Sequence, residues 1–381
     1  MRIVIVGGGP AGLYFGLLMK ARHRDYTIEI FERDGPSDTF GWGIVFSDQT
    51  FSYLRDRDHP SYRQIIGCCE TWDNLEVVHG DERISIHGNK FSGISRVTFL
   101  NVLQERCREL GVELHFKSAV TALDQLGGYD LLVGADGVGS LVRSTYAEHF
   151  QPELELRRNK YIWLGTHQRF EGLTLTFREQ EGGVYAAHSY KFSPTTSTFI
   201  VECPPETWQR AGLGELSDSE TRKFLAGVFR DDLGGERLLS NRYVKWQQFP
   251  LIRNRRWSFQ NVVLLGDALH TAHFSIGSGT KLALEDAISL FECFETQQQR
   301  ILPALEQFEA ARKPVIEDYQ SAAYASLLMF ESIPELMELD PLELAYRLMT
   351  RSGRIDHEKL RRRDPEFIAR YEHFKAAQPM A

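Results

Sequence analysis

Several features that mark membrane, secreted and metal-binding proteins are missing from this sequence. Its 381 residues contain no run of about 18 apolar residues, the length that a membrane-spanning helix needs, so we expect no membrane span. The five cysteines are odd in number and form no Cys-x-x-Cys pair, which predicts reduced thiols rather than a metal site or a redox disulfide. The first residues do not show the charged segment, apolar segment and cleavage site of a secretory signal peptide, so a cytoplasmic location is expected.

The chain also has no excess of positive charge. The net charge of −8 and the pI near 5.9 give the chain no general attraction to nucleic acid or to acidic membranes. A ligand that carries phosphates would therefore need its own cluster of basic residues. No internal repeat or low-complexity segment is evident, and the hydrophobic content of 42% suffices for a real core. The length favours two closely packed domains, in a monomer or a homodimer.

The N-terminal residues carry the clearest ligand-binding pattern. Arg2–Val6 is a short apolar, β-branched run, typical of a buried parallel strand, and a glycine-rich turn follows it directly. Gly7 would allow a tight turn, Gly9 would let the backbone approach a pyrophosphate, and Gly12 would let a helix pack closely on the sheet. The free N–H groups at the start of that helix would then face the phosphates.

An acidic residue completes this pattern. A second β-rich run, Thr27–Phe31, leads to Glu32, which lies 20 residues beyond Gly12. A carboxylate at the end of that strand can accept hydrogen bonds from ribose hydroxyls. A glycine motif alone is weak evidence, but strand, glycines, helix, strand and acid occur here in order. The sequence therefore predicts a dinucleotide site rather than a simple glycine-rich turn.

Two later segments are candidates for contact with the same ligand. Gly41–Ser47 has two glycines around Trp42, which suggests backbone close to a flat ligand, although a buried loop anchored by the tryptophan is equally compatible. The spacing of apolar residues predicts a helix from Arg96 that stops at Gly111. A cation at the start of a helix opposes the dipole, so we expect either a surface salt bridge or a cofactor contact to favour Arg96 there.

Acids also follow two further predicted strands. Asp130–Gly134 leads into Asp136 and Gly137, and Asn261–Leu265 leads into Gly266-Asp267. An acid followed by small residues at the carboxyl end of a strand is typical of a ligand-facing crevice in an open α/β sheet, although Asp136 alone could be a helix N-cap. The turn Gly277-Ser-Gly279-Thr280 precedes another predicted helix and repeats the phosphate-cradling arrangement. Two separated halves of the sequence are therefore expected to build one cleft.

The pattern of expected secondary structure changes between residues 159 and 250. Short strand-like runs with turn residues between them favour an antiparallel sheet inserted into the first domain. We expect the dinucleotide-binding domain at 1–158, the inserted sheet at 159–250, a return segment at 251–300 and a helical region at 301–381. The basic stretch Arg347–Arg363 is interpreted as a solvated face. Polar residues of the sheet that either line a cavity or lie on its ordinary surface are His167, His188 and Tyr190.

Together, three motifs resemble the single-component FAD-dependent aromatic hydroxylases, the para-hydroxybenzoate hydroxylase class. The motifs are Gly7-x-Gly9-x-x-Gly12 with Glu32, Asp136-Gly137 before Arg143, and Gly266-Asp267 before Gly277-x-Gly279. The resemblance implies an α/β fold with a Rossmann-like FAD-binding domain, an inserted antiparallel-sheet substrate domain and C-terminal helices. The residues that it places around an extended FAD are Gly7, Gly9, Pro10, Ala11, Gly12, Glu32, Arg33, Val45, Arg96, Asp136, Gly137, Asp267, Gly277, Gly279 and Thr280.

The resemblance also implies a reaction. NADH or NADPH reduces the FAD, O₂ adds to form a C4a-hydroperoxide, and one oxygen atom is transferred to an electron-rich ring carbon. The flavin carries this chemistry, so no residue is named as catalytic and no metal is expected. Phe274 stands where the family usually has a proline over the substrate ring, which leaves the shape of the pocket open. Residues expected near the substrate are His167, His188, Tyr190, His273, Phe274 and Ser275.

The expected substrate comes from more local resemblances. Residues 273–287 are similar to hydroxylases of aromatic coenzyme A thioesters, of the salicylyl-CoA 5-hydroxylase and 2-aminobenzoyl-CoA monooxygenase types. Residues 159–163 and 197–203 also resemble the tryptophan-derivative hydroxylase of violacein biosynthesis. We expect a hydroxy- or aminobenzoyl-CoA, with an indole-derived intermediate or a free aromatic acid as the alternative. The CoA phosphates would need basic residues, either the arginines within 347–363 or Arg157, Arg158 and Lys160.

Two other classes of protein would share part of this pattern. A flavin-dependent halogenase should have a Trp-x-Trp-x-Ile-Pro segment, and none is present. A non-catalytic protein that binds a flavin or another nucleotide would keep the fold without oxygen chemistry. A flavin absorption spectrum of the purified protein would argue against a merely chaperone-like role.

Overall fold

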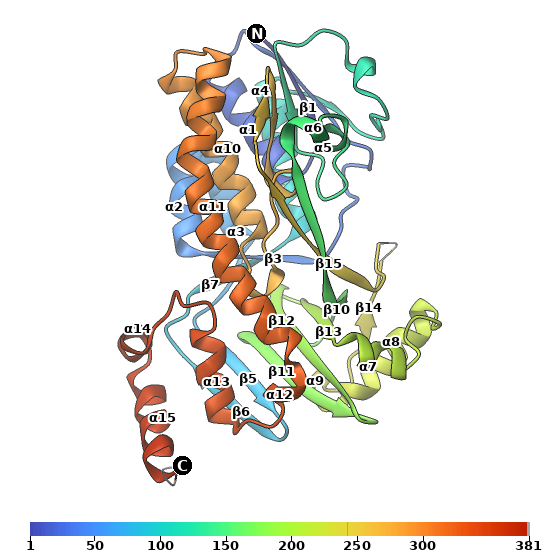
Figure 1. The fold of residues 1–381 in the computed structure, drawn as a ribbon, viewed down its shortest axis with the longest axis vertical. Coiled ribbons are helices and arrows are strands. Elements are labelled where there is room, and N and C mark those ends of the chain that lie inside the picture. Colours follow the sequence, from blue (N-terminus) through green and yellow to red (C-terminus); the bar gives the residue numbers. More distant parts are fainter. Residues whose placement is uncertain (242, 379–381) are drawn as a thin grey trace.

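Residues 1–241 and 243–378 are described by the computed structural model, apart from the side chains of Asp48 and Gln49. Two large sheets form the upper and lower halves of the molecule in Figure 1. The first has the order β16-β17-β9-β1-β2-β8, and all neighbours are parallel except β16 and β17. Its strands are β1 (Arg2–Val6), β2 (Thr27–Phe31), β8 (Glu113–His115), β9 (Leu131–Gly134), β16 (Ser258–Phe259) and β17 (Val262–Leu264).

Helices cover this sheet because its central strand is apolar on both faces. Ile3, Val4 and Ile5 are all fully buried, as expected for a parallel strand between helical layers. Helix α1 (Pro10–Arg22) packs against α4 (Arg96–Leu110) and α10 (Gly279–Thr296), and α11 (Ile301–Glu331) packs on α10. The predicted stop of α4 is confirmed, since Gly111 adopts a left-handed φ of +87°. Shorter helices here are α2 (Asp48–Arg57), α3 (His59–Gly67), α5 (Leu141–Thr145) and α6 (Ala147–Phe150).

The second sheet contains the strands expected between residues 159 and 250, together with strands from earlier in the chain. Its order is β14-β10-β13-β12-β11-β5-β6, and β15 also pairs with β10. All of these pairs are antiparallel except β5 with β11. Its strands are β5 (Leu75–His79), β6 (Glu82–Ile86), β10 (Pro152–Thr166), β11 (Leu173–Gln180), β12 (Gly183–Ser193), β13 (Thr196–Cys203), β14 (Leu238–Leu239) and β15 (Gln247–Asn254).

A small antiparallel sheet connects the two halves. It consists of β3 (Gly43–Ser47), β7 (Phe91–Ser95) and β4 (Glu70–Trp72), in the order β3-β7-β4. Gly43 donates its N–H to Thr198 Oγ1 at 3.0 Å and accepts a hydrogen bond from Tyr190 Oη at 2.9 Å. A Cβ on Gly43 would lie 2.7 Å from Thr198 Oγ1, so this contact between β3 and the second sheet requires glycine.

The C-terminal helices extend from the first half to the second. Helix α11, which contains Pro314, runs along both halves of the molecule in Figure 1. Helix α13 (Pro341–Thr350) packs against β5 and β6. The remaining helices are α7 (Pro205–Arg210), α8 (Asp218–Val228), α9 (Arg230–Leu233), α12 (Ile333–Leu336), α14 (His357–Arg363) and α15 (Pro365–Ala377). Over the described part of the chain, every helix is too short or too polar to cross a membrane.

A buried carboxylate fixes the return segment against these helices. Asp286 of α10 is fully buried and accepts hydrogen bonds from His270 Nε2 at 2.8 Å and from Arg312 Nε at 2.9 Å. Gly266 N donates to the same carboxylate at 3.3 Å. Burial raises the pKa of Asp286, but His270 and Arg312 outweigh burial and hold the pKa below its ordinary value. A charged Asp286 thus joins the turn 266–270 to α10 and α11.

Replacing Asp286 by asparagine should lower the free energy of unfolding by about 3 kcal/mol, because it removes a buried negative charge that interacts with His270 and leaves Glu285 as the remaining acid paired with buried Arg312. Urea denaturation followed by circular dichroism measures this loss. Since the folded pKa lies below the ordinary value of 3.8, the difference from wild type should persist from neutral pH to about pH 4 and fade in stronger acid. A Glu372→Gln control, which removes an exposed ion pair with Arg361, should change little, and an equal loss in both variants would contradict the role of Asp286.

Candidate active site

A cavity of about 1770 Å³ is lined by residues of both large sheets. A pocket for one small ligand needs roughly 300 to 1000 Å³, so this cavity has room for a dinucleotide and a second ligand. Its first section is formed by the carboxyl ends of β1, β2, β9 and β17 and by the N-termini of α1 and α10. Its second section is formed mainly by β10, β11, β12 and the segment 271–276.

Residues predicted from separate motifs meet in the first section. Gly12 does not line the cavity, because it lies beneath the turn and packs on Gly7. The predicted residues that do line it are Gly7, Gly9, Pro10, Ala11, Glu32, Arg33, Val45, Arg96, Asp136, Gly137, Asp267, Gly277, Gly279 and Thr280.

The turn after β1 brings backbone into very close contact. Gly7 has a φ of +110°, and a Cβ there would lie 2.2 Å from the Ala135 carbonyl oxygen. A Cβ on Gly12 would lie 2.2 Å from the Gly7 carbonyl oxygen, so α1 packs directly on the turn. A Cβ on Gly9, by contrast, would meet no atom within 4 Å. The N-terminus of α1 is therefore open, and its free N–H groups can bind an anion.

Glu32 holds this turn and also faces the cavity. Its Oε2 accepts a hydrogen bond from Gly8 N at 2.8 Å, and its Oε1 accepts one from Asp34 N at 2.9 Å. Each carboxylate oxygen has a further lone pair that ribose hydroxyls can use. Arg33 beside it is a surface residue whose side chain is 75% exposed and lies 3.4 Å from Asp34.

Asp136 stabilises a helix start at the edge of the cavity. Its Oδ2 accepts hydrogen bonds from Leu141 N at 2.6 Å and Val142 N at 3.3 Å, which are free N–H groups at the start of α5. Ser140, not Asp136, is the N-cap residue. The carboxylate of Asp136 thus has a structural use whatever the cavity binds.

Arg96 and Asp267 reach the cavity from distant parts of the sequence. Arg96 Nε donates to Thr39 Oγ1 at 2.9 Å, and its backbone N–H donates to Trp42 O at 2.9 Å. Burial lowers the pKa of Arg96 and raises the pKa of Asp267, while each charge opposes the shift in the other. Asp267 nevertheless remains open to the cavity. Arg96 and Asp267 are therefore a cation and an anion of the cavity that influence each other.

Val45 and Gly277 lie against each other on the cavity wall. Gly277 has a φ of +62°, and a Cβ there would lie 2.9 Å from Val45 Cγ1. Gly277 follows the short 3-10 helix η3 (Phe274–Ile276) and precedes α10. A larger side chain at Gly277 would push this turn away from β3. The structure thus brings together the 41–47 loop and the 277–280 turn, each with backbone exposed to the ligand space.

Aromatic side chains form the wall of the second section. Phe274 is at their centre, with ring centroids 4.9 Å from Tyr161, 5.4 Å from His188 and 6.2 Å from Phe249. All four residues line the cavity. Tyr190 lines it too, and burial raises its pKa to about 12, which keeps its hydroxyl neutral. Such a wall favours a flat aromatic ligand.

The structure does not bring every predicted substrate residue into the cavity. His167 is exposed and its Nδ1 lies 3.1 Å from Thr195 O, so its position is an ordinary one on the sheet surface. His273 is buried behind the wall, where burial lowers its pKa to about 4 and keeps it neutral. Ser275 lines the cavity, and its Oγ lies 2.8 Å from His273 Nδ1.

The basic residues near the cavity differ from the sequence-based interpretation. The stretch 347–363 is not a uniform solvated face, because Arg351, Arg354 and Arg363 line the cavity. Burial lowers the pKa of Arg351 to about 10. The other basic candidates do not line the cavity, and their partners are Glu331 at 2.6 Å for Arg157, Glu206 at 3.0 Å for Arg158 and Gln248 at 3.0 Å for Lys160.

Sequence reasoning also missed an acidic residue behind the wall. Glu202 is only 1% exposed, and its Oε1 lies 2.8 Å from His188 Nε2. The available signal was an acid within the strand-like run 196–203, whose other members are mostly apolar or small. A buried acid in such a run needs a partner, and sequence alone does not name it.

Other reactive groups within residues 1–241 and 243–378 do not form a second site. Glu29, Glu113 and His115 place their ligand atoms within 4.8 Å of one another, but Glu29 already accepts a hydrogen bond from Arg2 Nε at 2.7 Å. An acidic surface cluster of this kind does not establish a metal site. The five cysteines are all unpaired.

Known proteins with similar sequences identify the family. A family model described as FAD binding domain matches residues 129–322. Salicyloyl-CoA 5-hydroxylase from a Streptomyces species is 38% identical, over 97% of this chain and 73% of its own length. A 3-hydroxy-4-methyl-anthranilyl-(aryl-carrier protein) 5-monooxygenase from Streptosporangium sibiricum is 37% identical, over 93% of this chain and 95% of its own. Protodeoxyviolaceinate monooxygenase from Chromobacterium violaceum is 34% identical, over 90% and 92% respectively.

A solved structure supports the fold. The crystal structure of a mutant 2-methyl-3-hydroxypyridine-5-carboxylic acid oxygenase matches with a TM-score of 0.71 and 18% identity, over 95% of this chain and 98% of that one. The order of the motifs, the single cavity that unites them and the sequence relatives agree. The chain belongs to the FAD-binding-domain family and is an FAD-dependent aromatic monooxygenase.

Proposed function

We propose that this monooxygenase hydroxylates a hydroxy- or aminobenzoyl ring carried as a coenzyme A thioester, with NADH or NADPH as reductant and O₂ as co-substrate. One observation carries the proposal: the cavity that has an aromatic wall also has a basic rim, which we define as Lys90, Arg354 and Arg363. All three are exposed and line the cavity. In a protein with a net charge of −8, three exposed cations that line one cavity are a specific feature.

Contacts with neighbouring residues hold the basic rim in position. Arg363 Nη1 donates to Asn89 Oδ1 at 3.0 Å, next to Lys90 in the sequence. The guanidinium of Arg354 lies 3.7 Å from the ring centroid of Tyr319 and also pairs with Asp318. Arginine suits phosphate recognition because its planar fork donates two hydrogen bonds at once. The phosphates of a coenzyme A thioester would bind here while its ring reaches the aromatic wall.

The names of two relatives support a thioester substrate. Salicyloyl-CoA 5-hydroxylase takes its name from a coenzyme A thioester, and the Streptosporangium relative takes its name from an anthranilyl group on an aryl-carrier protein. For this chain we favour the coenzyme A form, because the basic rim suits several phosphates on one small molecule.

We infer that FAD occupies the first section of the cavity and supplies the redox and oxygen chemistry there. Glu32 would accept hydrogen bonds from ribose hydroxyls, and the open N-terminus of α1 would bind the pyrophosphate. Arg96 and Asp267 would contact the ribityl and pyrophosphate groups. Val45 and the Gly277–Thr280 turn would border the flavin ring. These residues fix the cofactor and exclude water, and the aromatic wall holds the substrate.

A second candidate substrate is an indole-derived intermediate. The relative from Chromobacterium violaceum takes its name from protodeoxyviolaceinate and shares 34% identity over 90% of this chain. The aromatic wall formed around Phe274 would accept an indole as well as a benzene ring, and such a substrate would leave the basic rim unused. A free aromatic acid would leave it largely unused for the same reason.

Glu32→Ala should weaken FAD binding by about 1 to 3 kcal/mol, because ribose hydroxyls lose a charged acceptor. Isothermal titration of the apoprotein with FAD measures the affinity. Glu113→Ala, which removes an exposed acid at the edge of the first sheet, serves as the control and should bind FAD like the wild type. Equal affinity of all three proteins would remove Glu32 from the cofactor site.

Asp267→Ala should yield largely apoprotein. The substitution removes the anion that interacts with Arg96, which is also the carboxylate proposed to contact the cofactor. The ratio of flavin to protein absorbance after extensive dialysis gives the retained fraction. Asp340→Ala, a helix-cap substitution outside the cavity, should keep its flavin. Full retention in Asp267→Ala would show that this carboxylate is not needed for FAD binding.

Arg354→Ala and Arg363→Ala should each raise KM for an aryl-CoA about tenfold, or about 1.4 kcal/mol, with little change in kcat. The reason is that the basic rim contacts the phosphates and not the ring. Added salt should weaken the wild-type affinity in the same direction. Arg362→Ala, whose residue neighbours Arg363 on α14 but does not line the cavity, is the matched control.

The assay follows NAD(P)H and O₂ consumption with product analysis. Salicyloyl-CoA, 2-aminobenzoyl-CoA, their free acids and indole compounds are compared side by side. Coupled turnover with an indole or a free acid, and none with an aryl-CoA, would reject the coenzyme A proposal in favour of the second candidate.

A further inference from the structure

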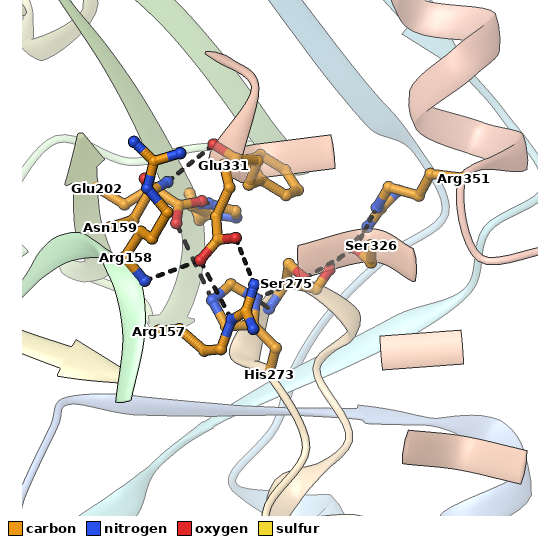
Figure 2. A network of polar contacts seen from close by, with 11 residues as sticks. Arg157, Arg158, Asn159, Glu202, His273, Ser275, Ser326, Glu331 and Arg351 are labelled. Atoms are coloured by element: carbon orange, nitrogen blue, oxygen red, sulfur yellow. Dashed lines mark hydrogen bonds and ion pairs between the residues drawn. The ribbon is translucent and has the colours of Figure 1, made fainter. Parts of the chain in front are cut away.

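Glu202 is a buried acid to which the proposed function gives no role. It lies on β13 with 1% of its surface exposed, and among the described residues the only hydrogen-bond partner of its carboxylate is His188 Nε2, at 2.8 Å from Oε1. Its Oε2 lies 4.0 Å from His273 Nε2. Figure 2 shows Glu202 in a network of polar residues in which His273 and Ser275 lead on toward Ser326. A carboxylate in this position is costly unless a partner compensates its charge.

The cations around Glu202 have other acceptors. Arg157 pairs with Glu331 at 2.6 Å. Arg351 donates through Nε to Ser326 Oγ and through Nη2 to Ser275 O, each at 2.7 Å. Arg351 interacts electrostatically with Glu202 but makes no hydrogen bond to it, whereas His188 makes that bond directly.

The neighbouring histidine cannot replace His188 as the partner of Glu202. His273 lies beyond hydrogen-bond distance of the acid, and burial lowers its pKa to about 4, so it is neutral at physiological pH. Tyr161 and Tyr190, the nearby ionisable groups on β10 and β12, each have a pKa raised to about 12 by burial and are neutral as well. Among the groups packed around this part of the wall, His188 is therefore the one with both a carboxylate partner and access to the cavity.

The bond to Glu202 determines which nitrogen of His188 carries hydrogen. A carboxylate only accepts, so Nε2 must donate to it. In the neutral ring Nδ1 then has a free lone pair, and no described residue forms a hydrogen bond to Nδ1. The ring is held between Phe274, at 5.4 Å, and Phe330, at 4.7 Å between centroids. Glu202 and the two phenylalanines thus orient an acceptor on a residue of the cavity wall.

We propose that His188, oriented by Glu202, accepts the hydrogen bond and then the proton of a hydroxyl group on the substrate ring. The oxygen–hydrogen bond breaks, a nitrogen–hydrogen bond forms at Nδ1, and the oxygen keeps the electron pair, so the step involves no oxidation or reduction. Glu202 stabilises the imidazolium that results. The ionised oxygen donates electron density to the ring, which oxygenation of that ring requires. The inference rests on the proposed function, since it needs an aromatic substrate with a hydroxyl group.

An oriented acceptor on the wall would select substrates by the substituents on their ring. His188 and Phe274 are both part of the wall, so a ring that stacks on Phe274 can present a substituent to His188. A phenol gives up a proton there and an aniline only donates a hydrogen bond. A ring without either substituent leaves His188 unsatisfied in a mostly apolar surrounding, which costs binding energy.

The test uses the FAD-loaded enzyme with salicyloyl-CoA and without NAD(P)H, so that no turnover occurs. The absorbance of the bound phenolate is followed against pH, with benzoyl-CoA, which has no hydroxyl, as the spectral blank. In the wild type the pKa of the bound phenol should fall by at least about one unit, a tenfold shift in its ionisation. His188→Gln and Glu202→Gln should remove most of this shift, while His167→Gln on the sheet surface should keep it.

Steady-state kinetics provide an independent readout. Each of the two variants should lower kcat about 100-fold near neutral pH, with a smaller effect on KM. The lost activity should return as the pH rises above the pKa of the phenol itself, because the hydroxyl then ionises without a base. A residue that only supports the fold would give no such recovery. FAD content and melting temperature show whether the variants fold.

The outcomes separate this inference from the proposed function. If no aryl-CoA binds or is hydroxylated by the wild type, the proposed function fails and the inference fails with it. If salicyloyl-CoA is hydroxylated but its bound phenol ionises at the same pH as the free compound, only the inference is overturned. The inference is also overturned if His188→Gln and Glu202→Gln both keep the wild-type shift in the pKa of the bound phenol. The titration of the wild type tests the inference even if a variant loses its FAD.

Discussion

The geometry of the active site depends on a charge that has no contact with solvent. Asp286 pairs with Arg312 at 2.9 Å, which joins α10 to α11, and its bond with His270 fixes the turn that carries Asp267. Helix α10 begins at the cavity, and α11 leads to the C-terminal helices of the second half. A buried ion pair of this kind contributes orientation more than net stability, because its desolvation offsets much of its attraction. Its main consequence is therefore that two distant sections of one cavity keep a fixed relationship.

Close backbone packing supplies the remaining constraint. Gly7 and Gly12 let β1, α1 and β9 approach until added Cβ atoms would overlap carbonyl oxygens. Gly43 allows a similarly close approach between β3 and the second sheet, where an added Cβ would overlap the side chains of Phe192 and Thr198. Because these positions are glycines, the side of each segment that faces the ligand consists of main-chain atoms. The cofactor section is consequently formed by main-chain groups and a few charges, whereas the substrate section is formed by side chains. Substrate choice can then change through side chains such as Phe274 without disturbing the cofactor section.

The sequence predicted much of what is local and missed what depends on distant partners. β1, β2 and the stop of α4 at Gly111 follow from apolar runs and a single glycine, and they lie where they were expected. The strands β5 and β6 were not expected, although they form a local antiparallel hairpin; β5 also pairs with β11, which comes much later in the chain. His167 and His188 were indistinguishable as strand residues, yet one is exposed and the other lies on the cavity wall. Arg351 was hidden in a basic stretch for the same reason, since tertiary packing and not composition determines burial.

The separation of the basic rim from the aromatic wall bears on how binding energy is used. Arg354 and Arg363 would hold phosphates that take no part in the chemistry, while Phe274 and His188 would contact the ring. Energy gained at the rim can offset the entropy lost when the ring is held in one orientation, so the ring itself needs few strong contacts. A largely apolar wall with one oriented acceptor is sufficient under that arrangement. An indole or a free acid would lack the remote contacts and would have to gain the same orientation from the wall alone. The basic rim is therefore the feature that physically distinguishes a coenzyme A thioester from these alternative substrates.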